Sequence, residues 1–185
     1  MVLRKLGWVE GPFAAKLVSM LLRAATPDDA GEVAIIHVRS WQVGYRGLMP
    51  DEYLDALRPE DRARRYTFGS PDPRQPATIV AVDEGAICGF VTTRPARDTA
   101  GRGELCALYV DPPSWGLGIG RALIATARDH LRSQDFTEAC LWVLVGNDRA
   151  ERFYRADGWV SDGTRRVVEV HGLMVDEVRY DRPVY

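Results

Sequence analysis

The feature that most constrains the fold is a set of three closely spaced glycines, Gly116, Gly118 and Gly120. An apolar run, 104–110, precedes them, and apolar residues at helical spacing follow through 134. The pattern therefore predicts a strand over 104–110, then a turn, and a helix over 116–134. Backbone N–H groups at the start of a helix lack partners, and small residues let an anion approach them closely. The turn is therefore expected to bind a phosphate group.

Two common phosphate-binding patterns do not match this turn. A P-loop requires Gly-Lys-Ser/Thr at the helix start, where this chain has Gly120-Arg121-Ala122. A dinucleotide fingerprint requires its third glycine three residues after the second, whereas these glycines are two apart. That fingerprint also opens a first βαβ unit, and the strands expected before Gly116 do not have that order.

A third pattern fits. The run from Val110-Asp111-Pro112 through the glycines to Leu123 resembles the central acetyl-CoA-binding motif of the GNAT superfamily of N-acetyltransferases. The segment 147–159, with Asn147, Ala150, Phe153-Tyr154 and Gly158-Trp159, resembles the motif that follows it in the family. The resemblance covers roughly 21–180 and is specific across 104–159. Trp115 departs from the pattern, because the family usually carries Arg or Gln there.

The remaining patterns fit a fold of the α/β (α+β) class. Residues 1–20 lack periodicity and are expected to be an N-terminal extension, which could be disordered, before a domain at 21–185. Strands are expected at 21–25, 78–82, 87–92, 104–110, 139–145, 164–170 and 173–180. Helices are expected from Thr26, which can cap, and at 50–57, 59–68, 116–134 and 147–156. The resemblance implies a mixed, mostly antiparallel sheet of six to seven strands with helices on both faces and a splayed central strand pair.

The resemblance also implies acetyl-CoA as the cosubstrate and assigns roles by position. Backbone groups of Leu108 and Tyr109 would pair with the pantetheine arm, and the Val110 N–H would bind the thioester carbonyl and the developing oxyanion. The pyrophosphate and the rest of the coenzyme would be held by Trp115, Gly116, Gly118, Gly120, Arg121, Ala122, Asn147, Ala150 and Phe153. For Trp115 this role falls to the backbone N–H. Asn147 has a second interpretation as the cap of the helix that starts there.

Two residues are candidates for proton transfer. Tyr154 matches the family tyrosine that protonates the departing thiolate, and a phenol with a pKa near ~10 stays protonated at neutral pH. Its alternative role is that of a core aromatic. Glu104, at the start of the central strand, is the candidate general base, with a solvated charge at a strand end as the alternative.

The acceptor side is expected between the first two helices, where Trp41 and Tyr45 could line a pocket. Asp51, Glu52 and Asp55 could attract a cation there or form a solvated helix face. The first hypothesis is transfer of acetyl to the primary amine of a small molecule. A peptide or protein acceptor and a non-catalytic CoA-binding module are the alternatives, and a deep acidic pocket would favour the first.

Composition excludes several other functions. The formal net charge is −2, so the chain has no basic field for nucleic acid or an anionic membrane. Three cysteines stand singly in apolar runs, which indicates buried thiols of a cytoplasmic protein rather than a metal or disulfide site. The histidines are scattered, so no metal is expected. The closing strand around Val167–Val170 is apolar and could pair between subunits of a homodimer.

Overall fold

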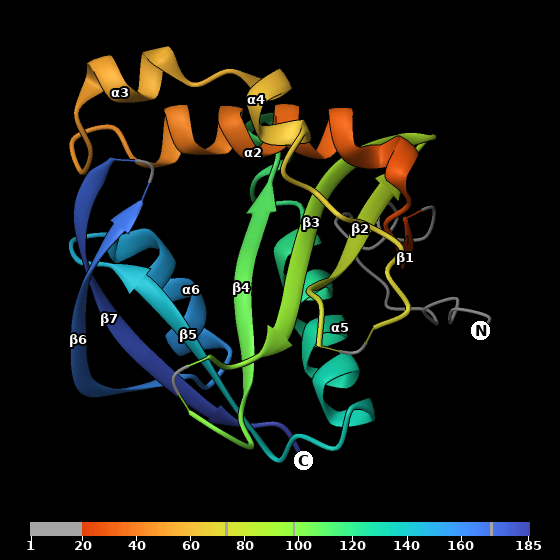
Figure 1. Ribbon diagram of the computed structural model, residues 1–185, viewed down its shortest axis with the longest axis vertical. Helices are drawn as coiled ribbons and strands as arrows, with labels where there is room; N and C mark the ends of the chain where they lie inside the picture. Colours follow the sequence, from red (N-terminus) through yellow and green to blue (C-terminus); the bar gives the residue numbers. More distant parts are fainter. Residues whose placement is uncertain (1–19, 73, 98, 171) are drawn as a thin grey trace.

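A seven-stranded sheet forms the centre of the protein in the computed structural model, which describes residues 20–72, 74–97, 99–170 and 172–185 (Figure 1). The strands are β1 (Leu21–Ala24), β2 (Ala77–Asp83), β3 (Ala86–Pro95), β4 (Gly103–Val110), β5 (Glu138–Leu144), β6 (Val160–Val170) and β7 (Leu173–Pro183). Their order is β1-β2-β3-β4-β5-β7-β6, and β4–β5 is the parallel pair among antiparallel neighbours. This confirms the predicted fold class. The predicted extension lies, except for Met20, outside the described residues.

Helices cover both faces of the sheet, as predicted. They are η1 (Pro27–Asp29), α2 (Ala30–Gly44), α3 (Asp51–Ala56), α4 (Pro59–Ala63), η2 (Pro112–Ser114), α5 (Ile119–Ser133) and α6 (Asp148–Ala156). The alternation of side chains along β2 places core residues on both faces of the sheet. Ala81 packs in the cluster that includes α5, whereas Val80 packs in the cluster that includes α2.

Two helices are shorter at one end than the sequence predicts. The backbone of Gly116 and Gly118 has positive φ, 80° and 84°, which a right-handed helix does not allow, so α5 begins at Ile119 instead of Gly116. The third predicted helix ends at Ala63 rather than Phe68. The glycines therefore form a turn ahead of α5, and the first N–H groups of this helix lie at the edge of that turn.

The expected splay of the central strands is present. β4 pairs with β5 only at Gly103↔Ala139 and Glu104↔Cys140, and the two strands then diverge (Figure 1). Just beyond this point the register of β3 against β4 shifts, from Thr93↔Leu105 to Thr92↔Ala107, so that Cys106 is the extra residue of a bulge. β5 stays paired with β7 along its length. The edge of β4 that faces β5 is therefore left without a strand partner over residues 105–110.

Candidate active site

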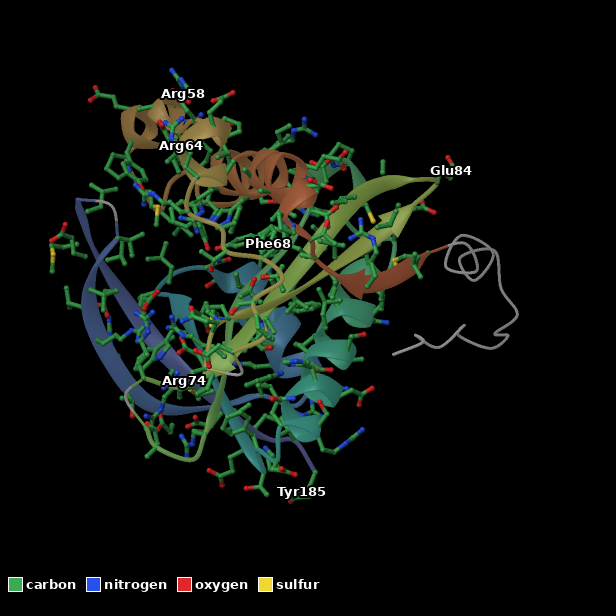
Figure 2. The ribbon with its side chains drawn as sticks, turned by 45° about the vertical axis from the view of Figure 1, so that its right-hand side comes forward. Arg58, Arg64, Phe68, Arg74, Glu84 and Tyr185 are labelled. Atoms are coloured by element: carbon green, nitrogen blue, oxygen red, sulfur yellow. The ribbon has the colours of Figure 1, made fainter. Side chains whose placement is uncertain are left out.

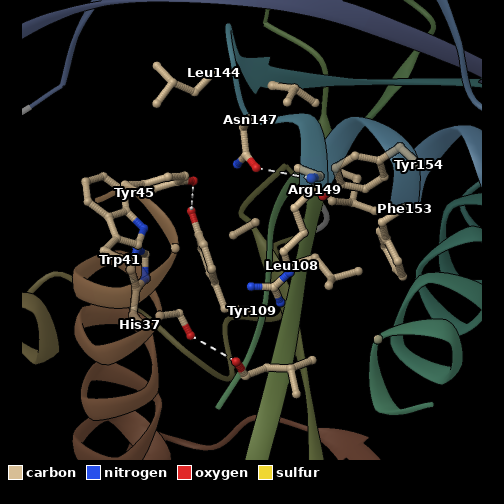
Figure 3. A pocket seen from close by; sticks show the side chains of 18 of the residues that line it. His37, Trp41, Tyr45, Leu108, Tyr109, Leu144, Asn147, Arg149, Phe153 and Tyr154 are labelled. Atoms are coloured by element: carbon tan, nitrogen blue, oxygen red, sulfur yellow. Dashed lines mark hydrogen bonds between the residues drawn. The ribbon is translucent and has the colours of Figure 1, made fainter. Parts of the chain in front are cut away.

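A cavity of about 660 Å³ fills the space between the diverging strands (Figure 3). The glycine turn and α6 bound one end, and side chains from α2, β4, β5 and β7 bound the other. Most of the residues predicted for the site line it: Trp41, Tyr45, Leu108, Tyr109, Val110, Trp115, Gly116, Gly118, Gly120, Arg121, Asn147, Ala150, Phe153 and Tyr154. The fold therefore brings together two motifs that lie apart in the chain.

The end of β4 presents a free N–H group to this cavity. The Asp111 N–H donates to Cys88 O on β3 at 2.9 Å, and alternate groups along a strand point to opposite sides. The N–H of Val110 therefore points toward β5 and the cavity. The carbonyl oxygen of Val110 accepts from Trp115 Nε1 at 2.7 Å and from Ser40 Oγ at 3.1 Å, so both side chains hold this residue in place.

The small residues of the glycine turn allow a ligand to approach its backbone closely. A Cβ added to Gly120 would lie 3.3 Å from a ring carbon of Phe153, so a larger residue would crowd α6, whereas the space above Gly116 is open. Two details differ from expectation. The Trp115 N–H donates to Pro112 O at 3.1 Å and is not available for a phosphate. Ala122 donates its N–H to Gly118 O at 3.1 Å within α5 and does not line the cavity.

A second cation that the sequence reasoning missed lies beside the turn. Arg149, at the start of α6, reaches into the cavity (Figure 3), and its guanidinium carbon lies 3.2 Å from the centroid of the Trp115 ring. Burial lowers the pKa of Arg149 from its ordinary value. A basic residue two positions after Asn147 was the signal available in the sequence. With Arg121, it gives this end of the cavity two positive charges.

The second motif supplies the helix cap and the tyrosine. The side-chain oxygen of Asn147 accepts the N–H of Ala150 at 3.1 Å, which confirms the predicted capping role. Tyr154 lines the cavity edge-on to Phe153, with ring centroids 5.3 Å apart. Burial is the largest cause of a pKa for Tyr154 well above that of an ordinary phenol, and the neighbouring Tyr109 adds to it. The hydroxyl therefore keeps its proton at neutral pH.

The other end of the cavity is aromatic. The Tyr45 and Tyr109 hydroxyl oxygens lie 3.2 Å apart, and Trp41 packs edge-on against Tyr45 (Figure 3). Glu177 on β7 is the only carboxylate among the described lining residues. Its oxygen accepts from Arg166 Nε at 2.8 Å, and its side chain is 17% exposed. The position of Glu177 gave no signal in the sequence, because β7 reaches the cavity only through its pairing with β5.

The acids that could have attracted a cation do not reach this cavity. Asp51 and Asp55 are exposed and pair with Arg46, at 3.0 Å for Asp51, and Glu52 is exposed. None of the three lines the cavity. The alternative of a solvated helix face is therefore the correct one, and the pocket walled by Trp41 and Tyr45 is aromatic rather than acidic.

Glu104 lies away from the position expected for a base, and the alternative of a solvated strand-end charge is also wrong. Its residue is 5% exposed and does not line the cavity. Both carboxylate oxygens accept from Arg94, at 2.9 and 3.0 Å. The reason is topological, because Glu104 sits where β4 and β5 are still paired and the strands diverge only beyond it.

The three cysteines differ in their exposure. Cys88 and Cys140 are buried as predicted, whereas the bulge exposes Cys106 to the cavity. No cluster of His, Cys, Asp and Glu among the described residues could hold a metal ion. No helix in the same part of the chain is long and apolar enough to cross a membrane.

The cavity, the glycine turn and the splayed strands agree with a comparison of the sequence with known families. A model of the acetyltransferase (GNAT) family matches residues 39–159, about two thirds of the chain. The chain belongs to the GNAT family. The matched region contains the glycine turn, both central strands and α6, and therefore most of the cavity wall.

Individual relatives agree with this assignment. The chain is 30% identical over 129 residues to the uncharacterized N-acetyltransferase YuaI of Bacillus subtilis. This match covers 68% of the chain and 72% of the relative. It is 35% identical over 106 residues to a mycothiol acetyltransferase of Propionibacterium freudenreichii, but this match covers 56% of the chain and only 33% of that longer protein. The fold is similar to that of the PaiA N-acetyltransferase of Thermoplasma acidophilum, solved with coenzyme A, with a TM-score of 0.66, 20% identity and coverage of 89% and 99%.

Proposed function

We propose that this GNAT protein transfers an acetyl group from acetyl-CoA to a primary amine of a small molecule by direct attack of the amine on the thioester. The observation that carries the proposal is the cavity between β4 and β5, because the two binding requirements meet at its opposite ends. The glycine turn and two arginines suit a diphosphate. The aromatic end around Trp41 and Tyr109 suits a compact acceptor.

Three features support a coenzyme at the first end. The free edge of β4 could pair with the pantetheine arm as a strand would. The N–H groups at the start of α5 and the charges of Arg121 and Arg149 suit a pyrophosphate. The T. acidophilum protein of similar fold was solved with coenzyme A.

The chemistry needs a neutral amine, a stabilised oxyanion and a proton for the leaving group. An alkyl amine has a pKa near ~10.4, so only about one in a thousand is neutral at pH 7. In our proposal Glu177 replaces Glu104 as the base that receives the amine proton, directly or through water. The nitrogen bonds to the thioester carbon, the Val110 N–H holds the oxyanion, and the C–S bond breaks as Tyr154 protonates the sulfur.

An acceptor screen tests this proposal. Release of free CoA thiol is followed for a panel of small amines, amino acids and peptides, and acetyl-CoA binding is measured separately by calorimetry. Turnover of small amines supports the proposal, and a strong preference for peptides would establish the alternative of a peptide acceptor. Binding of acetyl-CoA without transfer to any amine would indicate a non-catalytic CoA-binding module. Failure to bind acetyl-CoA would contradict the proposal altogether.

We also propose that the protein forms a homodimer through β6. This strand is at the edge of the sheet, and its Val160 and Val167 are 68% and 63% exposed. Exposed apolar edge strands pair readily with another strand, and a second copy offers an identical one. Light scattering should give twice the monomer mass, and Val167→Lys should shift the protein to monomer. A monomeric wild-type protein would refute this proposal.

A further inference from the structure

We infer that the amine acceptor also carries an anionic group, which Arg62 and the arginines beside it bind. The inference rests on the proposed function, since it names the class of acceptor for the same cavity. The charge around the acceptor end differs from that expected for the site of a polyamine. The acids on α3 that could have attracted a polyamine point away, and Arg62 lines the cavity instead.

A second, smaller recess adjoins the cavity at this end. It has a volume of about 150 Å³ and lies among α2, α3 and α4. Its wall shares His37, Trp41 and Arg62 with the main cavity, so Arg62 faces both spaces. Arg58 is also part of its wall and lies at the top of the molecule in Figure 2.

Three arginines, Arg58, Arg62 and Arg65, line the recess together with Asp61, which itself accepts from Arg64. Arg62 also donates its Nε–H to His37 Nδ1 at 3.3 Å. Arg58 donates to the carbonyl oxygens of Asp55 and Leu57 at 2.7 and 2.9 Å, and these neutral acceptors leave its charge in place. An anion entering the recess would therefore meet guanidinium groups that can donate several hydrogen bonds.

A buried hydroxyl group also points to a ligand. Tyr53 lines the recess, and its Oη is shielded from solvent and has no hydrogen-bond partner among the described residues. Arg62 and Arg65 line the same recess as Tyr53, and burial raises the pKa of Tyr53 while the positive charges of these two arginines lower it. An O–H donor next to guanidinium groups matches the oxygens of a carboxylate, and a bound carboxylate would satisfy the hydroxyl.

The charges around Tyr109 indicate how such an acceptor would be oriented. Burial is the main reason that the pKa of Tyr109 is raised, but Arg62 lowers it and Glu177 raises it. Arg62, Tyr109 and Glu177 all line the main cavity, so this cavity presents one positive and one negative group beside the phenol. An acceptor with an amine at one end and a carboxylate at the other would place the amine toward Glu177 and the carboxylate toward Arg62. A diamine of equal length would place a positive charge against Arg62.

The test compares two series of acceptors of equal length. The series are ω-amino carboxylic acids with three to six carbons and the diamines of the same chain lengths, assayed by thiol release. In the wild-type protein we expect kcat/KM to be roughly ten- to a hundredfold higher for the best amino acid than for its diamine. Arg62→Met should remove this preference by raising KM for the acid, and Arg62→Lys should restore part of it. Arg74→Gln, which removes an exposed charge far from α4, is the matched control and should change neither series (Figure 2).

The outcomes separate this inference from the proposed function. Diamines turned over as well as the acids, or an equal effect of Arg62→Met on both series, would overturn the inference while leaving the acetyltransferase in place. Since Arg62 also packs near Trp41 and Tyr66, its variants could fail to fold, and Arg65→Gln at the rim then provides the same comparison with a smaller expected loss. If neither series is acetylated, calorimetry of the amino acids with the acetyl-CoA complex decides, because an absence of binding refutes the anion site. Failure to bind acetyl-CoA would instead refute the proposed function.

Discussion

Arg149 Cζ lies 3.2 Å from the centroid of the Trp115 ring, so a guanidinium stacks on an indole at the mouth of the glycine turn. Trp115 stands where the family usually has Arg or Gln, and Arg121 was the one cation among the residues that the resemblance assigned to the coenzyme. The stack shows that α6 brings a second cation to the same place. The indole also donates Nε1–H to Val110 O at 2.7 Å, which links the turn to the end of β4.

Arg149→Gln should weaken acetyl-CoA binding about tenfold, because it removes a charge from the proposed diphosphate site. Calorimetry at two salt concentrations measures this, and the wild-type affinity should depend more steeply on salt than that of the variant. Arg152→Gln is the matched control, since Arg152 is on the same helix, exposed, and does not line the cavity. Equal losses in both variants would argue against a specific role for Arg149.

Tyr154→Phe should lower kcat by about a hundredfold with little change in acetyl-CoA affinity, because it removes the proposed proton donor and leaves the ring. The folded pKa of Tyr154 is raised above the ordinary phenol value, so the donor is lost only as pH rises through that higher value. The kcat of the wild-type protein should therefore show no alkaline loss from this group up to about pH 10. Tyr185→Phe at an exposed position should leave the kinetics unchanged. A parallel fall in kcat and affinity for Tyr154→Phe would contradict the acid role.

Glu104→Gln should destabilise the protein by about 2 kcal/mol, or roughly 4–8 °C in Tm, and leave kcat close to the wild-type value. The side chains of Glu104 and Arg94 are only 6% and 20% exposed, so removing one charge leaves the other poorly compensated. Glu138→Gln breaks a pair whose carboxylate is 57% exposed and should cost less than about 1 kcal/mol. Thermal unfolding measures the stability of both variants, and steady-state kinetics measures their kcat. A large loss of kcat at unchanged Tm would restore Glu104 as a base.

Gly118→Ala and Gly31→Ala should change stability in opposite directions. Gly118 has a φ of 84°, which costs a residue with a Cβ about 1–2 kcal/mol. Gly31 lies within α2 with nothing within 4 Å of an added Cβ, and alanine there should add roughly 0.5–1 kcal/mol. Chemical denaturation measures both. Unchanged stability for Gly118→Ala would mean that the turn relaxes and that its glycine is not required by the backbone.

The amino-acid sequence by itself determined most of the elements and the residues of the proposed coenzyme end of the cavity. Hydrophobic periodicity, the Thr26 cap and the glycine spacing are local signals, and they predicted most elements to within a few residues. The two motifs were recognisable because residues 110–123 and 147–159 each form a short contiguous unit. The predicted boundaries of the elements were less accurate. At Gly116, for example, the backbone dihedral angles rather than the periodicity decide where the helix begins.

Only the tertiary structure decided which residues form the proposed acceptor end and which charges lie there. Glu177, Arg62 and Tyr53 come from β7, α4 and α3, and no sequence spacing relates them. Glu104 and Asp55 are acids like Glu177, but the point at which β4 and β5 diverge buries the first in an ion pair, and helix orientation turns the second to solvent. The role of a charged side chain depends on which neighbouring groups exclude water from it. These neighbours are set by contacts between distant segments of the chain.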